Sequence, residues 1–289
     1  MRNCIKKFIK AKFIIALFLT GNAILAVSCG TSSSSGSSSI GKTGSTARFA
    51  IAGDVLYTLS SRPRSDAATP PSPASPWYAQ SGEPIIRTFD ITEPSTPLKS
   101  TDVPIYSWPE TLFSNGSQIF VGALTGMEIY ELIEPLRPRF QSQVSHIRAC
   151  DPVVTEGTKA YVTLRGGSGC FNQENVLEII DFTNPTAPIK LNRFAMNAPF
   201  GLAVQDGRAF ICDGPAGLRV LDVKDHAHIK DLPSVPVDIC TDVILSGQRL
   251  ITTGFTGLAQ YEVSQSPPRK LSVIPISEDL SSGATQSIK

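Results

Sequence analysis

The sequence predicts an all-β protein whose body is a β-propeller, most simply one with five blades of four antiparallel strands. Three observations lead to this fold class: a strand-and-turn unit that recurs about every 40 residues, no sustained helical periodicity, and a composition poor in charge but rich in turn formers. Of the 289 residues, 41% are hydrophobic and 18% are charged, and 22 are Gly and 22 are Pro. Low charge with frequent turns favours short strands over long, salt-bridged helices.

The repeated unit is marked by an apolar stretch that ends in an acidic residue. The acidic residues are spaced by 41, 50, 41 and 40 residues and are Asp90, Glu131, Asp181, Asp222 and Glu262. A turn glycine lies upstream of each one, and these are Gly53, Gly116, Gly157, Gly207 and Gly247. Each copy therefore predicts four strands joined by short connections, which is typical of a propeller blade. The five copies span residues 45–278, and a sixth, degenerate copy is the alternative.

The connections within a copy differ in length. In the fourth copy we expect strands at 200–205, 208–212, 217–223 and 229–233. The distance from glycine to acid is 15 residues in three copies but 24 in the third and 37 in the first, which indicates insertions of 9 and 22 residues after the second strand. Prolines repeat at a regular spacing after the acid. Because alternate connections of antiparallel strands meet at one end, the insertions should share one rim, and the glycine and proline turns the other.

The N-terminal 28 residues have the features of an export signal. Five basic residues precede an apolar run at 13–27, which is too short for a stable membrane-spanning helix. The run ends in LAVSC, and this resembles the lipobox of bacterial lipoproteins, although Leu25 lies four residues before Cys29 rather than three. The resemblance implies cleavage before Cys29 and lipidation of its thiol. A secreted soluble protein with the same cleavage site is the alternative.

The segments that flank the predicted propeller contain little that could be buried. Residues 29–44 are expected to form the lipidated cysteine and a flexible Ser/Gly-rich tether, and residues 279–289 a disordered tail. Removal of residues 1–28 leaves 21 Lys and Arg against 25 Asp and Glu, a net charge of −4. This balance argues against a nucleic-acid partner. We expect an exported lipoprotein of the bacterial cell envelope, at the outer membrane or cell surface, whose membrane contact is the lipid on Cys29.

A resemblance to a known family rests on the third strand of the fourth copy, whose sequence over residues 217–223 is GLRVLDV. This strand resembles the LVIVD repeat, which is found in predicted β-propellers of bacterial surface and secreted proteins. The resemblance extends over residues 45–278 through the period rather than through any one residue. It implies a propeller and, often, a lipoprotein anchor. It implies no particular activity, because a fold does not settle a function.

Four cysteines remain beyond the proposed lipid attachment site, and disulfides are permitted in an exported protein. They are Cys150, Cys170, Cys212 and Cys240. The repeat frame places all four at the rim with the insertions, with the first two in one blade and the last two in adjacent blades. We therefore predict the pairs 150–170 and 212–240. Free buried thiols are an alternative, and a metal site is a remote one because no Cys-x-x-Cys is present; neither a metal nor another cofactor is expected.

Polar and aromatic residues of little evident structural use gather at the same rim. The candidate binding rim consists of Trp108, Glu110, His146, Arg148, Asp151, Arg165 and Asp213. Glu110 and Asp151 both lie six residues before their turn glycine and should occupy equivalent places in neighbouring blades. The carboxylates could pair with the arginines and merely stabilise the ring, or they could contact a ligand.

Two functions of different classes fit these features. The favoured one is a binding or interaction scaffold for an envelope protein or a glycan. The alternative is a glycosidase, in which Glu110, Asp151 and Asp242 would be carboxylates at the mouth of the channel, one acting as acid and another as nucleophile or base. Nothing in their spacing is diagnostic, so no residue is assigned a catalytic role.

Overall fold

The fold is all-β, as the sequence predicts. The structure is a computed structural model, and it describes residues 44–63, 82–146, 152–167, 174–237, 240–254 and 257–276. These residues form twenty strands and one short 3-10 helix, Gly214–Ala216. The predicted signal, Cys29 and most of the tether lie outside the described residues. Within the described part, no helix is long and apolar enough to cross a membrane.

The strands form five antiparallel sheets of four, each made of consecutive strands in chain order. Sheet 1 contains β1 (Phe49–Ala52), β2 (Val55–Pro63), β3 (Gly82–Asp90) and β4 (Leu98–Pro104). Sheet 2 contains β5 (Pro109–Ser114), β6 (Gln118–Ala123), β7 (Gly126–Glu131) and β8 (Arg139–Ser145). Sheet 3 contains β9 (Val153–Glu156), β10 (Lys159–Leu164), β11 (Val176–Asp181) and β12 (Ile189–Ala195). Sheet 4 contains β13 (Leu202–Gln205), β14 (Arg208–Cys212), β15 (Leu218–Asp222) and β16 (Lys230–Val235). Sheet 5 contains β17 (Cys240–Ser246), β18 (Arg249–Gly254), β19 (Gly257–Glu262) and β20 (Arg269–Pro275).

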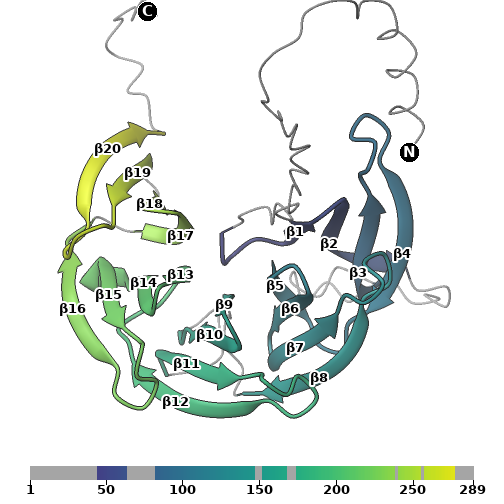
Figure 1. Cartoon of the computed structure of the whole chain (residues 1–289), viewed down its shortest axis with the longest axis horizontal. Coiled ribbons are helices and arrows are strands. Elements are labelled where there is room, and N and C mark those ends of the chain that lie inside the picture. The colour runs from purple at the N-terminus through teal and green to yellow at the C-terminus, as the bar shows by residue number, and fades with distance from the viewer. Residues whose placement is uncertain are drawn as a thin grey trace, which may run out of the picture. The chain divides into compact units, whose positions relative to one another are not determined.

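Five sheets of four strands confirm the predicted number and make-up of the blades. In Figure 1 the first strand of each sheet lies on the inner side and the fourth strand on the outer side. The predicted strands of the fourth copy agree with sheet 4 to within about two residues at each end. The closing of the five sheets into a complete ring stays a prediction.

Four apolar interfaces join the consecutive sheets. An aromatic side chain at the same position of the second strand faces the next sheet in each interface, namely Tyr57, Phe120, Tyr161 and Phe210, and all four are at most 1% exposed. Burying one such side chain contributes roughly 1.5–3 kcal/mol. Each repeat of about 40 residues thus contributes one large buried aromatic side chain to the core between neighbouring sheets.

The first hairpin turns of sheets 1, 3 and 5 share one backbone geometry, while every first hairpin turn of the five sheets has a glycine with positive φ. Gly53, Gly157 and Gly247 have φ angles of 58°, 57° and 59°, in the left-handed region that favours glycine. After the third strand, the Asp90 carboxylate accepts a hydrogen bond from the Thr92 amide at 2.9 Å, and Asp181 does the same for Thr183 at 2.8 Å. The spaced acid of the repeat is therefore the residue that starts this turn.

The segment that precedes β1 connects the first and last sheets. The Ser45 hydroxyl donates to Asp242 Oδ1 at 2.9 Å, and the Thr46 hydroxyl donates to Asp242 Oδ2 at 2.6 Å. Ser45 Oγ in turn accepts a hydrogen bond from the Leu202 amide at 2.7 Å. A Cβ at either Gly44 or Gly201 would lie 2.0 Å from the Asp242 carboxylate, and at Gly201 it would also lie 2.6 Å from the Asp242 Cα, so glycine lets the chain approach Asp242 closely from both sides.

Candidate functional site

Opposite the hairpin turns lies a second end of the sheets, here called the crossover rim. It consists of residues 105–110, 123–126, 146, 165–167, 196–201, 213–217, 236–237, 254 and 257. Five of the seven candidate residues lie there, as the repeat frame predicts: Trp108, Glu110, His146, Arg165 and Asp213. Arg148 and Asp151 lie outside the described residues, as do Cys150 and Cys170 of the first predicted disulfide.

Arg165 lies where β10 ends and is packed rather than extended into solvent. Its guanidinium carbon lies 4.1 Å from the centre of the Phe200 ring. Burial lowers the pKa of Arg165, while the charge of Glu110 raises it. The carbonyl oxygen of Glu110 accepts a hydrogen bond from Arg48 Nη1 at 3.2 Å. Glu110 and Arg165 thus interact electrostatically across neighbouring sheets, which fits the structural alternative for this pair.

Asp213 is fully buried, and its carboxylate is occupied by hydrogen bonds from the crossover between sheets 3 and 4. Its Oδ1 accepts from the amides of Asn197 at 2.8 Å and Ala198 at 2.9 Å. Its Oδ2 accepts from the Asn197 side chain at 3.1 Å and from Arg219 Nη1 at 3.2 Å. With both oxygens engaged, Asp213 serves to hold the crossover to β14 and β15.

The second predicted disulfide is confirmed. Cys212 and Cys240 are bonded, with 5.4 Å between their Cα atoms and a sequence separation of 28. The bond joins the end of β14 in sheet 4 to the start of β17 in sheet 5. It therefore fixes one crossover of the rim at the point where two sheets meet.

Exposed aromatic side chains lie at the crossover between sheets 1 and 2. Tyr106 is 70% exposed and Trp108 is 43% exposed. The Tyr106 ring lies 4.6 Å from the ring of Phe140 on β8, which in turn packs edge-on against Tyr130 at 5.7 Å. We call Tyr106, Trp108 and Phe140 the aromatic surface. Tyr106 and Phe140 were not among the candidate residues, although two aromatic residues one apart in a loop are a signal that the sequence does contain.

A buried carboxyl group supports the backbone of this surface. Glu128 on β7 is fully buried, and its Oε2 accepts hydrogen bonds from the Tyr130 hydroxyl at 2.6 Å and from the Tyr106 amide at 3.2 Å. Burial raises the pKa of Glu128, and these hydrogen bonds partly oppose the rise. The sequence signal that was missed is an acidic residue at a core-facing position of an apolar strand.

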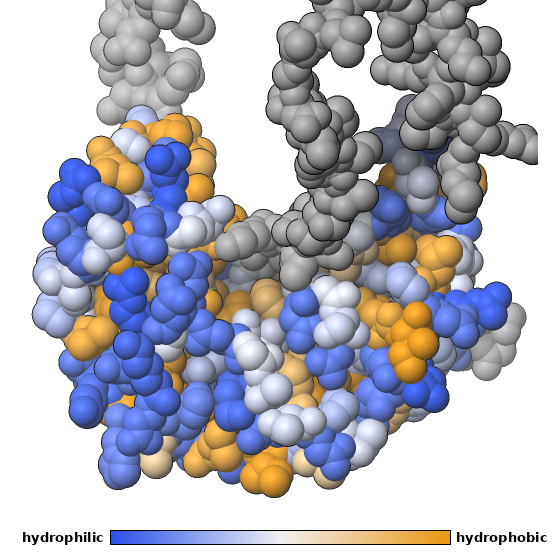
Figure 2. All heavy atoms as spheres, in the orientation of Figure 1, coloured by the Kyte–Doolittle hydropathy of each residue, from blue (hydrophilic) through white to orange (hydrophobic). Residues whose placement is uncertain are grey.

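A metal centre would need a cluster of ligand side chains, and a glycosidase would need a pair of carboxylates. In the described ranges, no group of three or more His, Cys, Asp and Glu residues could hold a metal ion. Of the three carboxylates in the glycosidase alternative, Asp151 is not described and Asp242 is hydrogen-bonded to Ser45 and Thr46. Figure 2 shows hydrophilic and hydrophobic residues interspersed over the visible face, with hydrophobic ones gathered at the end of β20.

No family model matches this chain, and no curated protein matches it either. Solved structures of similar fold include the periplasmic gluconolactonase PpgL of Pseudomonas aeruginosa, with TM-score 0.56 and 10% identity, and a candidate 6-phosphogluconolactonase of Bacteroides fragilis, with TM-score 0.55 and 11% identity. A protein from Lactobacillus plantarum has TM-score 0.53 and 15% identity. Each alignment covers 77% of this chain and 68% of the other. At such identities the likeness shows the fold alone, which is propeller-like.

Proposed function

We propose that this protein is an exported lipoprotein, anchored through lipidated Cys29, whose five-bladed propeller binds a protein or glycan partner of the cell envelope at the crossover rim. The resemblance of residues 217–223 to the LVIVD repeat supports the propeller and the lipoprotein anchor of this proposal, but it does not bear on the binding role. On this proposal the sheets form the rigid support, and the crossovers that differ from sheet to sheet supply recognition.

The aromatic surface is the observation that carries the proposal. Tyrosine and tryptophan combine a large apolar area with a polar edge and are enriched at binding hot spots. Tyr106 and Trp108 are exposed on a crossover whose backbone is held by Glu128 and by a hydrogen bond from the Leu124 amide to the Trp108 carbonyl at 3.0 Å. A surface that is already ordered loses little conformational entropy on binding. By contrast, Asp213 and Arg165 are engaged within the protein.

The test compares a double variant at the rim with a matched one at the opposite end. Tyr106→Ala with Trp108→Ala should reduce capture of the partner at least about tenfold, measured by co-purification from solubilised native envelope and by a glycan array. Ile133→Ala with Ile189→Ala removes comparable exposed apolar area at the turns, where these residues are 72% and 64% exposed, and should leave capture unchanged. Equal capture by both variants would overturn the proposal.

The anchor has a separate test. Cys29→Ala should move the protein from the membrane fraction to the soluble fraction, because a lipid is the membrane contact that the proposal assigns to the mature chain. A Cys29→Ala variant that still partitions with detergent would show that another feature holds the protein at the membrane.

The glycosidase alternative needs two carboxylates that are free to act at one substrate. Among the described candidates, Asp242 is enclosed by Gly44 and Gly201 and hydrogen-bonded through both oxygens, while Glu110 is coupled to Arg165. These contacts favour the binding role. Hydrolysis of a mixed glycan by the wild-type protein that is lost on Glu110→Gln would reverse this choice.

A further inference from the structure

One register position of the third strand faces the preceding sheet and differs in sheet 5 from sheets 2, 3 and 4. It pairs with a second-strand residue in each case: Glu128 with Val121, Glu178 with Val162, Arg219 with Ile211, and Ala259 with Thr252. Three sheets thus place a long charged side chain at this position, and sheet 5 places a methyl group. Sheet 1 also has a long charged side chain here, Arg87 opposite Thr58, so sheet 5 differs from all the others in lacking one, while its paired hydroxyl on Thr252 has a counterpart in sheet 1.

The long side chains at this register position form ion pairs and hydrogen bonds with neighbouring residues. Glu178 pairs with Lys190 at 3.2 Å and with Arg193 at 3.0 Å. Arg219 pairs with Asp231 at 2.7 Å and donates to the Ala195 carbonyl at 3.2 Å. Because Ala259 has no such extension, the corresponding space in sheet 5 is not filled by the strand itself.

A pocket of about 300 Å³ lies at this place, between sheet 5 and the crossover that leads into it. This volume is at the lower end of the range for small-molecule sites, about 300–1,000 Å³. Its lining consists of Pro236, Val237, Cys240, Thr252, Thr253, Gly254, Gly257, Leu258, Ala259, Tyr261, Lys270 and Val273. The disulfide at Cys240 fixes one wall of the pocket to sheet 4. The pocket thus extends from the crossover rim along sheet 5 and is distinct from the aromatic surface.

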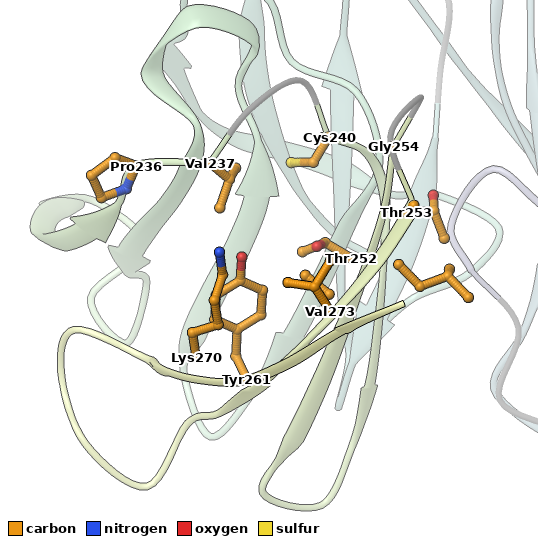
Figure 3. A pocket seen from close by; sticks show the side chains of 12 residues that line it. Pro236, Val237, Cys240, Thr252, Thr253, Gly254, Tyr261, Lys270 and Val273 are labelled. Carbon is orange, nitrogen blue, oxygen red and sulfur yellow. The ribbon is translucent and has the colours of Figure 1, made fainter. Parts of the chain in front are cut away.

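The polar groups of the pocket favour an anion with oxygen acceptors. Lys270 lies directly opposite Tyr261 on the paired strands β20 and β19, and Figure 3 shows the Lys270 amino group and the Tyr261 hydroxyl pointing to the same side, toward Val237. Within the described residues no acidic group pairs with Lys270, since the neighbouring Glu262 is taken by Arg269. Burial raises the pKa of Tyr261, and a hydrogen bond with Thr252 partly opposes the rise, so the phenol remains protonated at neutral pH.

The remaining walls favour a short apolar group next to that anion. Val237, Ala259 and Val273 contribute aliphatic surface, and the two glycines bring backbone close to the space. The Lys270 amino group and the Tyr261 hydroxyl on one side, with aliphatic walls on the other, match a compact amphiphilic anion rather than a bare inorganic one.

We propose that this pocket binds a small aliphatic carboxylate, with the carboxylate held by Lys270 and Tyr261 and the short carbon chain over Ala259 and Val273. The proposal goes beyond the partner-binding role of the aromatic surface and does not depend on it, because the two sites share no residue. A failure of partner capture would leave it standing, and a failure of carboxylate binding would leave the partner-binding proposal standing.

Isothermal titration calorimetry with the full-length protein in mild detergent tests the proposal. The probes are 4-methylpentanoate, its neutral isostere 4-methylpentanamide, and inorganic phosphate. We expect saturable binding of the carboxylate, binding of the amide weaker by at least about tenfold, and no saturable binding of phosphate, because both the charge and the apolar chain contribute. No saturable binding of 4-methylpentanoate, or binding of phosphate that is equally tight, would overturn the proposal.

Three variants locate the binding. Lys270→Gln should weaken 4-methylpentanoate binding at least about tenfold, whereas Lys230→Gln, the same charge change on β16 of the neighbouring sheet, should leave it unchanged. Ala259→Gln restores a long side chain of the kind found in sheets 2–4 and should abolish binding. If Ala259→Gln does not fold, the comparison of Lys270→Gln with Lys230→Gln decides, and equal affinities of those two variants would overturn the proposal.

Discussion

The two ends of the sheets follow different rules. At the end with the hairpin turns, similar features recur: a glycine with positive φ in each first hairpin, near 58° in sheets 1, 3 and 5, and an aspartate that accepts the amide two residues later in sheets 1, 3 and 4. At the crossover rim each connection is stabilised in its own way, by the buried carboxylate of Asp213, by the disulfide of Cys212 or by the hydrogen-bonded crossover around Tyr106. The repeat therefore determines one end and leaves the other free to vary.

This difference explains where recognition can develop. A turn that requires a positive φ or an aspartate acceptor tolerates little change of sequence. A crossover held by side-chain contacts can exchange those contacts for others without disturbing the strands that it connects. The exposed side chains of Tyr106 and Trp108 lie at the crossover rim, and the pocket beside Ala259 extends from that rim, where Pro236, Val237, Gly254 and Gly257 line it, along sheet 5.

The largest effect on the free energy of unfolding is expected at the crossover rim, where a buried aspartate is replaced. An aspartate at the turn end of the same sheet serves as the comparison. Asp213→Ala should lower the free energy of unfolding by about 3–5 kcal/mol, because it leaves the amides of Asn197 and Ala198 without their buried acceptor and removes one of the two carboxylates that pair with Arg219. Asp222→Ala, at the turn end of the same sheet, should cost less than about 1 kcal/mol. Urea denaturation measures both, and similar losses would contradict the distinction between the two ends.

The disulfide should have the next largest effect. Replacing both Cys212 and Cys240 by alanine should lower the free energy of unfolding by about 2–4 kcal/mol, since the bond closes a loop of moderate length in the unfolded chain. Non-reducing urea denaturation of the variant and the wild type checks this. A loss below about 0.5 kcal/mol would show that the bond does not constrain the crossover.

The buried carboxyl under the aromatic surface predicts a dependence on pH. The folded-state pKa of Glu128 is raised above the ordinary glutamate value of about 4.3, so its protonated form stabilises the fold below that pH, and the stabilisation is lost as pH rises through the raised pKa. Glu128→Gln should therefore gain stability relative to wild type as pH rises from about 4 to 8. Glu178→Gln is the control and should lose stability at neutral pH, because it weakens the pairing with Lys190 and Arg193.

The smallest effect concerns an aspartate of the turn end. Hydrogen bonds from Thr183, with help from Lys159, lower the pKa of Asp181 to about 2. The ionised form then stabilises the fold above the ordinary pKa of about 3.9, and this contribution is lost as pH falls toward 2. Because the side chain is close to solvent, Asp181→Asn should cost less than about 1 kcal/mol at pH 7, and the difference from wild type should vanish near pH 2 in an acid titration of stability.

Much of the fold could be predicted from the sequence because the features that repeat are local. The spaced acids start the turns, the glycines adopt positive φ, and the cysteine pair 212–240 followed from its place in the repeat. The site was less predictable, since it depends on which neighbour a side chain meets. The sequence suggested that Asp213 could contact a ligand, but its carboxylate is hydrogen-bonded to the crossover at Asn197. The roles of Glu128 and Ala259 could be recognised only when the same register position was compared between sheets.

Site-specific photo-crosslinking in the native envelope tests most directly that the crossover rim is the working surface. A benzophenone amino acid is introduced at Trp108 on that rim or at Ile133 in a turn at the opposite end, both of which are exposed. The account predicts covalent adducts of defined mass from position 108 and none from position 133. Adducts that form equally or preferentially from position 133, or from neither position, would contradict it.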